Sequence, residues 1–255
     1  MQNSNHFNMY SKKYHALELT SDSSHEKNYV VAVEDTIELF VNDISIASIL
    51  ATPEMQKELA YGYLICEGIV KVPDDIQGIR IDGNTIHIEV EPTEHLELWR
   101  ELRSSGCVGV RWEENESISV DSDTIFSPET IKKSLVFLES EVYTSTRGTH
   151  AACLVNAGGE CVAKAIDVGR HNAFDKVVGR ACLLGIDMSK HFILSTGRQS
   201  AGMVLKAARA GIPLVATKTA PLNTGIDAAR RTGVCLVCFV SHDKMSVFAH
   251  PERLK

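Results

Sequence analysis

The residues best suited to chemistry lie together in one short stretch, residues 166–179. It reads Ile-Asp-Val-Gly-Arg-His-Asn-Ala-Phe-Asp-Lys-Val-Val-Gly and holds five ionisable side chains and an asparagine. The apolar run 161–166 predicts a buried strand, and an apolar repeat at helical spacing follows over 174–181. Free backbone N–H groups and the positive end of a helix make such a junction a good anion site. Residues 167–172 therefore predict an anion site, with a capped helix bearing solvated charges as the alternative.

A second polar junction follows the next apolar strand. Residues 195–200 read Ser-Thr-Gly-Arg-Gln-Ser and open another helix, so glycine, hydroxyls and an arginine again meet a positive helix end. In α/β sheets, ligands bind outside the carboxyl ends of the strands. The candidate anion-binding residues at these strand ends are Arg170, His171, Gly197 and Arg198. His150, at the start of another strand, is expected to join them.

The third candidate is a polar turn after a buried strand near the C-terminus. It comprises Phe239, Val240, Ser241, His242, Asp243 and Lys244. The imidazole of His242 and the ammonium group of Lys244 suit a phosphate or the edge of a guanine ring. An ordinary polar hairpin uses the same residue types, so the pattern alone leaves both interpretations open.

Cys107 is the cysteine that is not embedded in an apolar run. Serines and glycines surround it, and Arg103 and Arg111 flank it with positive charge. Nearby cations lower the pKa of a thiol, and the thiolate is the form that attacks sulfur. A flexible loop would also let this thiolate reach two different partners. The sequence therefore predicts a nucleophile at Cys107, with an idle surface cysteine as the alternative.

The remaining cysteines lie in apolar surroundings. Four of them read as small core residues: Cys66, Cys153, Cys161 and Cys182. Cys235 and Cys238 form a Cys-x-x-Cys pair, but they lie in the apolar run 233–240, which predicts a buried strand. Positions three apart on a strand face opposite sides, so this pair is not expected to share a metal or form a disulfide.

Composition excludes several classes of partner. The chain has 255 residues, of which 44% are hydrophobic and 23% charged, as in a soluble globular protein. A net charge of −7 argues against broad binding to nucleic acid or an acidic membrane. The sequence shows no signal-peptide core and no run that could span a bilayer. Together with an odd number of cysteines, seven, this predicts a cytoplasmic protein with reduced thiols.

The N-terminal half is expected to contain a tail and a small domain. Residues 1–27 are polar and predict a flexible tail, and residues 28–124 predict a small α+β domain with the Cys107 loop near its end. Alternating apolar residues around turn signals predict hairpins over 36–49 and 78–90. Between them, Thr52 is expected to cap a helix that stops near Gly68.

Residues 125–255 predict a second domain of the α/β class. A helix is expected over 126–143, and strands and helices alternate beyond it. This alternation predicts a mixed, mostly parallel sheet with helices on both faces.

Several of these motifs carry a resemblance that extends from about residue 30 to the C-terminus. The matching segments are the 166–179 stretch and residues 51–53, 61–69, 148–150, 195–198, 206–213 and 250–254. In this order they resemble the FdhD family, the formate dehydrogenase accessory sulfurtransferases. By this resemblance the C-terminal domain should adopt the three-layer cytidine-deaminase-like fold.

The resemblance also implies a function and a set of partners. Cys107 would receive sulfur as a persulfide from a cysteine desulfurase. Residues 239–244 would hold molybdenum bis(molybdopterin guanine dinucleotide), which a guanine nucleotide could mimic. Sulfur would pass to the metal before the cofactor enters apo-formate dehydrogenase, and a homodimer is plausible for such a relay. No structural metal is expected.

Two departures leave alternatives open. Many relatives carry a second cysteine in the loop, whereas this chain has Ser-Gly-Cys-Val-Gly around Cys107, so an intraloop disulfide is ruled out. A cofactor-binding chaperone in which Cys107 is incidental remains an alternative. A deaminase-type zinc hydrolase would need a catalytic Glu and a Pro-Cys-x-x-Cys motif at two helix starts. Neither Arg170-His-Asn-Ala nor Gly197-Arg-Gln-Ser provides them.

Overall fold

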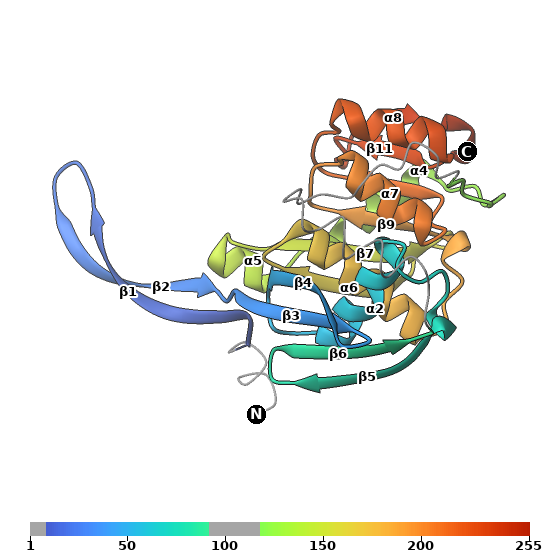
Figure 1. Cartoon of the computed structure of the whole chain (residues 1–255). Coiled ribbons are helices and arrows are strands. Elements are labelled where there is room, and N and C mark those ends of the chain that lie inside the picture. Colours follow the sequence, from blue (N-terminus) through green and yellow to red (C-terminus); the bar gives the residue numbers. More distant parts are fainter. Residues whose placement is uncertain (1–8, 92–117) are drawn as a thin grey trace.

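The computed structural model of the chain describes residues 9–91 and 118–255 (Figure 1). These residues form an N-terminal two-stranded hairpin, a four-stranded sheet and a six-stranded sheet. Helices α2 (Gln56–Cys66) and α6 (Arg170–Leu183) lie between the two larger sheets. One continuous hydrophobic core contains residues from both sheets, so the two halves of the chain are packed together. Cys107 and its loop lie outside the described residues.

The four-stranded sheet has the order β4-β3-β6-β5. Both predicted hairpins are confirmed, since β3 pairs antiparallel with β4 and β5 with β6. Asn42 and Asp43 have φ values of 46° and 62°, as a tight turn that suits the strand twist requires. The strands are β3 (Asp35–Val41), β4 (Ile44–Ala51), β5 (Ile76–Asp82) and β6 (Thr85–Val90).

Helix α2 begins later than predicted. Thr52 does not cap it: the first helical residue is Gln56, and Met55 precedes it in a left-handed conformation with φ of 57°. Thr52 is buried because it joins distant strands instead. Its hydroxyl donates to the carbonyl of Val33 over 3.3 Å, and its backbone N–H donates to Oδ2 of Asp167 over 3.1 Å.

The six-stranded sheet has the order β12-β11-β10-β9-β7-β8. Only the β9–β10 and β10–β11 pairs are parallel; β7 is antiparallel to both of its neighbours, and β12 is antiparallel to β11. The prediction of a mixed sheet is confirmed, but a mostly parallel one is wrong for these pairings, because short turns rather than helices join β7 to β8 and β11 to β12. The strands are β7 (His150–Asn156), β8 (Cys161–Asp167), β9 (His191–Ser195), β10 (Leu214–Thr217), β11 (Cys235–Cys238) and β12 (Ser246–Ala249).

Helices cover both faces of this sheet. On one face α6, α7 (Ala201–Arg209) and α8 (Asn223–Thr232) bury their apolar sides in the shared core. The other face is covered by the segment predicted as one helix over 126–143, which is broken into three short pieces. The pieces are α4 (Pro128–Lys133), the 3₁₀ turn Ser134–Leu138 and α5 (Glu141–Thr146). The break follows from Ser140, whose hydroxyl caps α5 by accepting from the N–H of Tyr143.

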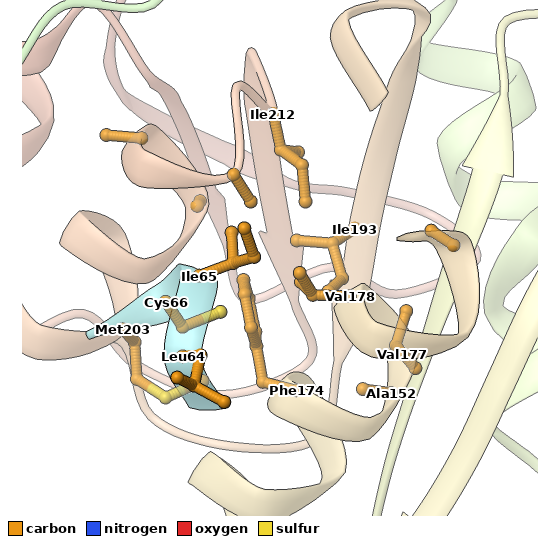
Figure 2. Close-up of a cluster of buried hydrophobic side chains, with 14 of the residues drawn as sticks. Leu64, Ile65, Cys66, Ala152, Phe174, Val177, Val178, Ile193, Met203 and Ile212 are labelled. Carbon is orange, nitrogen blue, oxygen red and sulfur yellow. The ribbon is translucent and has the colours of Figure 1, made fainter. Parts of the chain in front are cut away.

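The shared core is built on a close crossing of α2 and α6. A Cβ added at Gly62 would lie 1.7 Å from the carbonyl oxygen of Asp175, and one at Gly179 would lie 1.8 Å from that of Glu58. Two glycines therefore let the helix backbones meet. Figure 2 shows Leu64 and Ile65 from α2 facing Phe174 from α6 in this core.

Residues 118–124, which precede the predicted C-terminal domain, form hydrogen bonds with that half of the chain. Val120 donates its N–H to the carbonyl of Thr232 over 2.8 Å, and Arg253 donates to the carbonyl of Ser122 over 2.6 Å. Residues 118–124, which the prediction assigns to the N-terminal domain, therefore pack against the C-terminal half.

Residues 11–32 form a hairpin, so the part of the predicted flexible tail from residue 11 onward is ordered instead. Strands β1 (Ser11–Leu19) and β2 (Ser24–Ala32) pair over nine residues and project from the body of the protein (Figure 1). Cross-strand pairs stabilise it: the carboxylate of Glu18 accepts from Lys27 over 2.7 Å and lies 2.9 Å from His25. The polar sequence did not predict this hairpin, because most side chains on both of its faces are exposed.

No helix in residues 9–91 or 118–255 is long and apolar enough to cross a membrane.

Candidate functional site

Three of the predicted site segments lie at one edge of the six-stranded sheet. Strands β8, β9, β10 and β11 all end at this edge, and β7 begins there, because β7 is antiparallel to β8 and β9. His150 starts β7, Arg170 and His171 follow β8, and Gly197 and Arg198 follow β9. The turn 239–244 follows β11. We call this side of the sheet the ligand edge.

Arg170 rests on the loop that follows β9. A Cβ added at Gly197 would lie 2.8 Å from the Cβ of Arg170, so a side chain at position 197 would displace the arginine. Nδ1 of His150 lies 3.1 Å from the hydroxyl of Thr196 in the same loop. The Nε atom of Arg170 is buried and has no hydrogen-bond partner among the described residues. Unpartnered buried donors are rare in folded proteins, and this one lies at the ligand edge.

The two histidines at this position are held neutral. Burial and the charge of Arg170 lower the pKa of His150 below its ordinary value. Burial, together with the charges of Lys206 and Arg170, lowers the pKa of His171 to about 4. At neutral pH both imidazoles can therefore donate one hydrogen bond and accept another without adding charge.

Asp167 is a supporting residue of the 166–179 stretch. It is fully buried, and its Oδ2 accepts from Nζ of Lys176 over 2.5 Å. Its Oδ1 accepts from the N–H of Gly169 over 2.8 Å and from the side-chain amide of Asn172 over 2.9 Å. Asp167 therefore fixes the entry into α6 and with it the position of Arg170.

A second buried charge cluster lies beneath His171. Nζ of Lys206 lies 2.8 Å from each carboxylate oxygen of Asp175 and 2.7 Å from Oε1 of Glu67. Burial lowers the pKa of Lys206, but the two carboxylates outweigh burial and hold the pKa above its ordinary value. The cluster joins three of the motif segments, from α2, α6 and α7.

Hydrogen bonds between hydroxyl and backbone groups join the loops in the middle of the ligand edge. The hydroxyl of Thr217 donates to the carbonyl of Gly197 over 2.8 Å and lies 3.0 Å from the hydroxyl of Thr219. The carbonyl of Thr219 accepts from the N–H of Phe239 over 3.0 Å. Sequence reasoning missed this segment and the exposed Lys218 within it. The available signal was the polar run Thr217-Lys218-Thr219 at the end of a short apolar strand.

The six residues of the turn 239–244, after β11, differ from one another in burial. Val240 is buried in the core, so its side chain faces away from the ligand edge. Ser241 closes the turn by donating its N–H to the carbonyl of Lys244 over 2.8 Å, while His242 and Asp243 are exposed. Phe239 is 44% exposed and has φ of 55°, an uncommon conformation for a bulky residue.

The ligand edge carries unneutralised positive charge. Its four cations come from four loops, and within residues 9–91 and 118–255 none of them forms an ion pair: Arg170, Arg198, Lys218 and Lys244. A local group of unpaired cations in a chain of net charge −7 is typical of an anion-binding surface.

The described cysteines differ in burial and in pKa. Cys235 and Cys238 lie in separate core clusters, which confirms that they face opposite sides of β11, and burial raises the pKa of each to about 12. Cys66 and Cys153 are buried as predicted, whereas Cys161 and Cys182 are half-buried. A hydrogen bond with the thiol of Cys153 lowers the pKa of Cys161 to about 7. Cys161 is therefore the described thiol to compare with Cys107.

In the part of the chain that the structure describes, no three His, Cys, Asp or Glu side chains are grouped so that they could hold a metal ion.

The fold defines a mixed α/β protein, and a group of cations lies at one edge of its six-stranded sheet. The model of the FdhD/NarQ family matches residues 32–255, and the chain belongs to this family.

Relatives of known name match most of the chain. It is 38% identical over 208 residues to the sulfur carrier protein FdhD of Methanothermobacter thermautotrophicus, covering 80% of this chain and 83% of the relative. It is 32% identical to the sulfur carrier protein FdhD of Wolinella succinogenes, covering 90% and 84%. A crystal structure described as a formate dehydrogenase accessory protein, from Desulfotalea psychrophila, superposes with a TM-score of 0.81 at 27% identity, covering 96% of this chain and 100% of the other.

Proposed function

We propose that this protein is a sulfur carrier that prepares the molybdenum cofactor of a formate dehydrogenase. Membership of the FdhD/NarQ family supports a role in sulfur transfer. The observation that carries the proposal for the cofactor is the ligand edge, where four unpaired cations adjoin two neutral histidines. A cysteine desulfurase would be the sulfur donor, and apo-formate dehydrogenase would receive the cofactor.

Sulfur would be taken up by Cys107. In this step the Cys107 thiolate attacks the terminal sulfur of the donor's persulfide, a new S–S bond forms on Cys107, and the donor leaves as its thiolate. The exchange is neutral in electrons and needs no outside oxidant. Arg103 and Arg111 flank Cys107 in the sequence and would favour its thiolate form.

The residues of the ligand edge fit a cofactor that carries phosphates and a guanine ring. Molybdenum bis(molybdopterin guanine dinucleotide) is the cargo of the proposed reaction, and its diphosphates would pair with the cations of this edge. The orphaned Nε of Arg170 and the close approach of Gly197 to that side chain support a site made to receive a polar group. His150 and His171 would contribute hydrogen bonds without changing the charge of the site.

Intact-mass spectrometry tests the sulfur carrier role. The chain is incubated with a cysteine desulfurase and cysteine, and the wild type is compared with Cys107→Ala and Cys161→Ala. We expect a gain of one sulfur atom in the wild type and in Cys161→Ala, and no gain in Cys107→Ala. Cys161 is the matched control because its lowered pKa makes it the competing nucleophile among the described thiols. A gain that persists in Cys107→Ala would exclude the assignment.

A cofactor-binding chaperone is the second candidate, since the ligand edge does not need Cys107 to bind an anion. Activation of formate dehydrogenase in cells that carry Cys107→Ala separates the two functions, because a chaperone would remain active. A homodimer, a cytoplasmic location and a cytidine-deaminase-like fold for the C-terminal half are part of the same proposal. Sedimentation of the purified chain would test the dimer.

A further inference from the structure

Two cysteines bring their sulfur atoms together between neighbouring strands, away from the ligand edge. Cys153 lies in the middle of β7, and Cys161 is the first residue of β8. A hydrogen bond joins the two thiols, and both side chains pack in the same hydrophobic cluster. The ligand edge is at the other end of β8, where the strand finishes at Asp167. The pair is therefore separate from the residues of the proposed cofactor site.

A β-bulge in β8 places the two sulfurs on one face of the sheet. The register between β7 and β8 shifts by one residue, so that Val162 is an extra residue in β8 and Cys161 lies opposite Val155. Val162 and Ala163 both pack in the shared core, although successive residues of a regular strand face opposite sides. Unbroken alternation would have turned Cys161 to the same face as Ala163. The bulge turns it instead to the face of Cys153.

The two thiols differ in their access to solvent and in their ionisation. Cys153 is fully buried, whereas Cys161 is half-buried. The hydrogen bond with Cys153 and the charge of Lys164 lower the pKa of Cys161 to about 7, while the same hydrogen bond and burial raise the pKa of Cys153. A reagent from solvent therefore meets Cys161, much of it as the reactive thiolate at neutral pH. Cys153 can reach Cys161 only from within the core.

A covalent bond between these sulfurs needs only a local movement. An S–S bond is about 2.0 Å long, so hydrogen-bonded thiols must approach each other to form one. Within residues 9–91 and 118–255, β8 is the edge strand of its sheet and pairs with β7 alone. The start of β8 can therefore shift toward Cys153 without breaking hydrogen bonds to a second strand.

We propose that Cys153 and Cys161 are a reversible modification site, which a hydroperoxide oxidises to a disulfide. The thiolate of Cys161 attacks the peroxide, so that an S–O bond forms, the O–O bond breaks and the departing oxygen takes a proton from solvent. The thiol of Cys153 then attacks the sulfenic acid on Cys161. The S–S bond forms, the S–O bond breaks, and the hydroxide leaves with the proton of Cys153 as water.

The reaction balances without a further reagent. The two thiols together lose two electrons, and the hydroperoxide takes them up as its O–O bond is cleaved. A small dithiol reverses the step by thiol–disulfide exchange. The inference does not rest on the proposed function, because neither Cys107 nor the ligand edge takes part.

Peptide mapping of the full chain tests the modification. The protein is treated with hydrogen peroxide, alkylated in denaturant and digested with trypsin, which leaves both cysteines in one peptide, residues 148–164. We expect this peptide to be two hydrogen atoms lighter and to carry no alkyl group. After reduction with dithiothreitol it should take up two. Cleavage after Glu160 should leave the two parts of the oxidised peptide joined.

Three variants separate the steps. Cys153→Ala should stop the reaction at the sulfenic acid of Cys161, which dimedone would label, whereas Cys161→Ala should leave the buried Cys153 unmodified. Cys182→Ala is the matched control, because Cys182 is also half-buried but burial raises its pKa to about 11. This variant should form the disulfide as the wild type does. Circular dichroism shows that each variant is folded.

The wild-type peptide alone can overturn the proposal, so the test does not depend on the folding of a variant. Two alkyl groups on residues 148–164 after peroxide treatment would show that the thiols do not form a bond. A disulfide from Cys161 to any other cysteine, in the same chain or in a second copy, would show that Cys153 is not its partner. Lasting dimedone labelling of the wild type at Cys161 would contradict the attack by Cys153.

Discussion

At the scale of single residues, the charged groups of the 166–179 stretch have two separate roles. Asp167, Asp175 and Lys176 are buried and hold α6 against β8, α2 and α7. Arg170 and His171 lie at the start of the same helix and face the ligand edge. The fully buried groups therefore determine where the half-buried Arg170 and His171 lie. Disturbing either set would impair the site, but only the buried set should also lower stability.

Asp167→Asn should destabilise the protein strongly. The substitution leaves the buried ammonium group of Lys176 without a counter-ion, and breaking one side of a buried pair costs about 3–5 kcal/mol. Urea unfolding measures this loss. Adding Lys176→Met to Asp167→Asn removes the unpaired charge, so the double variant should recover part of the stability. A double variant no more stable than the single one would show that the other hydrogen bonds of Asp167 dominate.

His171 should make stability depend on pH between about 4 and 6.5. Its pKa falls from 6.5 to about 4 on folding, so in this range the unfolded chain binds a proton that the folded chain does not. Stability from this group is therefore complete above pH 6.5 and is lost as the pH falls toward 4, by about 2 kcal/mol for a partly exposed ring. Denaturant unfolding of the wild type and His171→Asn from pH 4 to 7 measures it. Parallel stability curves would contradict the expectation.

At the scale of elements, sequence patterns correctly predicted the elements whose formation depends on residues close in sequence. The hairpins over 36–49 and 78–90 were predictable because apolar alternation and turn residues agree there. The start of α2 was not, because Thr52 bonds to Val33 and Asp167, which are distant in sequence. Tertiary pairing overrode a good local capping signal.

Local sequence patterns also predicted part of the ligand edge, but the prediction was incomplete. Glycine, arginine and histidine at strand-to-helix junctions identified its β8 and β9 loops. Lys218 was missed because a lone lysine after a strand has no local pattern, and its importance comes from the strand order. The inward orientation of Val240 likewise follows from packing and could not be read from the turn signal.

The crossing of α2 and α6 should tolerate no side chain at Gly62. A Cβ there would lie 1.7 Å from a backbone oxygen that cannot move without shifting α6, so Gly62→Ala should cost at least about 3 kcal/mol despite the better helix propensity of alanine. Urea unfolding measures the loss. Gly78→Ala is the matched control, because the nearest atom to its Cβ would be 3.4 Å away on a side chain. Equal effects of both substitutions would show that the helices can separate at little cost.

At the scale of the whole molecule, the chain combines a body with one shared core and a hairpin outside it. The core contains residues of both larger sheets, so the body should unfold as one unit. The hairpin adds little to that core: Leu17 is 60% and Leu19 72% exposed. An isolated two-stranded hairpin is marginally stable in water.

Shortening the hairpin should therefore leave the body intact. Replacing residues 14–29 by Asn-Gly keeps the Lys13–Val30 pair at its base and also keeps Tyr10, whose burial against the body raises its pKa to about 12. The free energy of unfolding should change by less than about 1 kcal/mol, because the removed side chains bury little apolar surface. In the full chain, amides of β1 and β2 should exchange with solvent much faster than those of β3. A large loss of stability on shortening, or equally slow exchange in β1 and β3, would show that the hairpin contributes to the stability of the body.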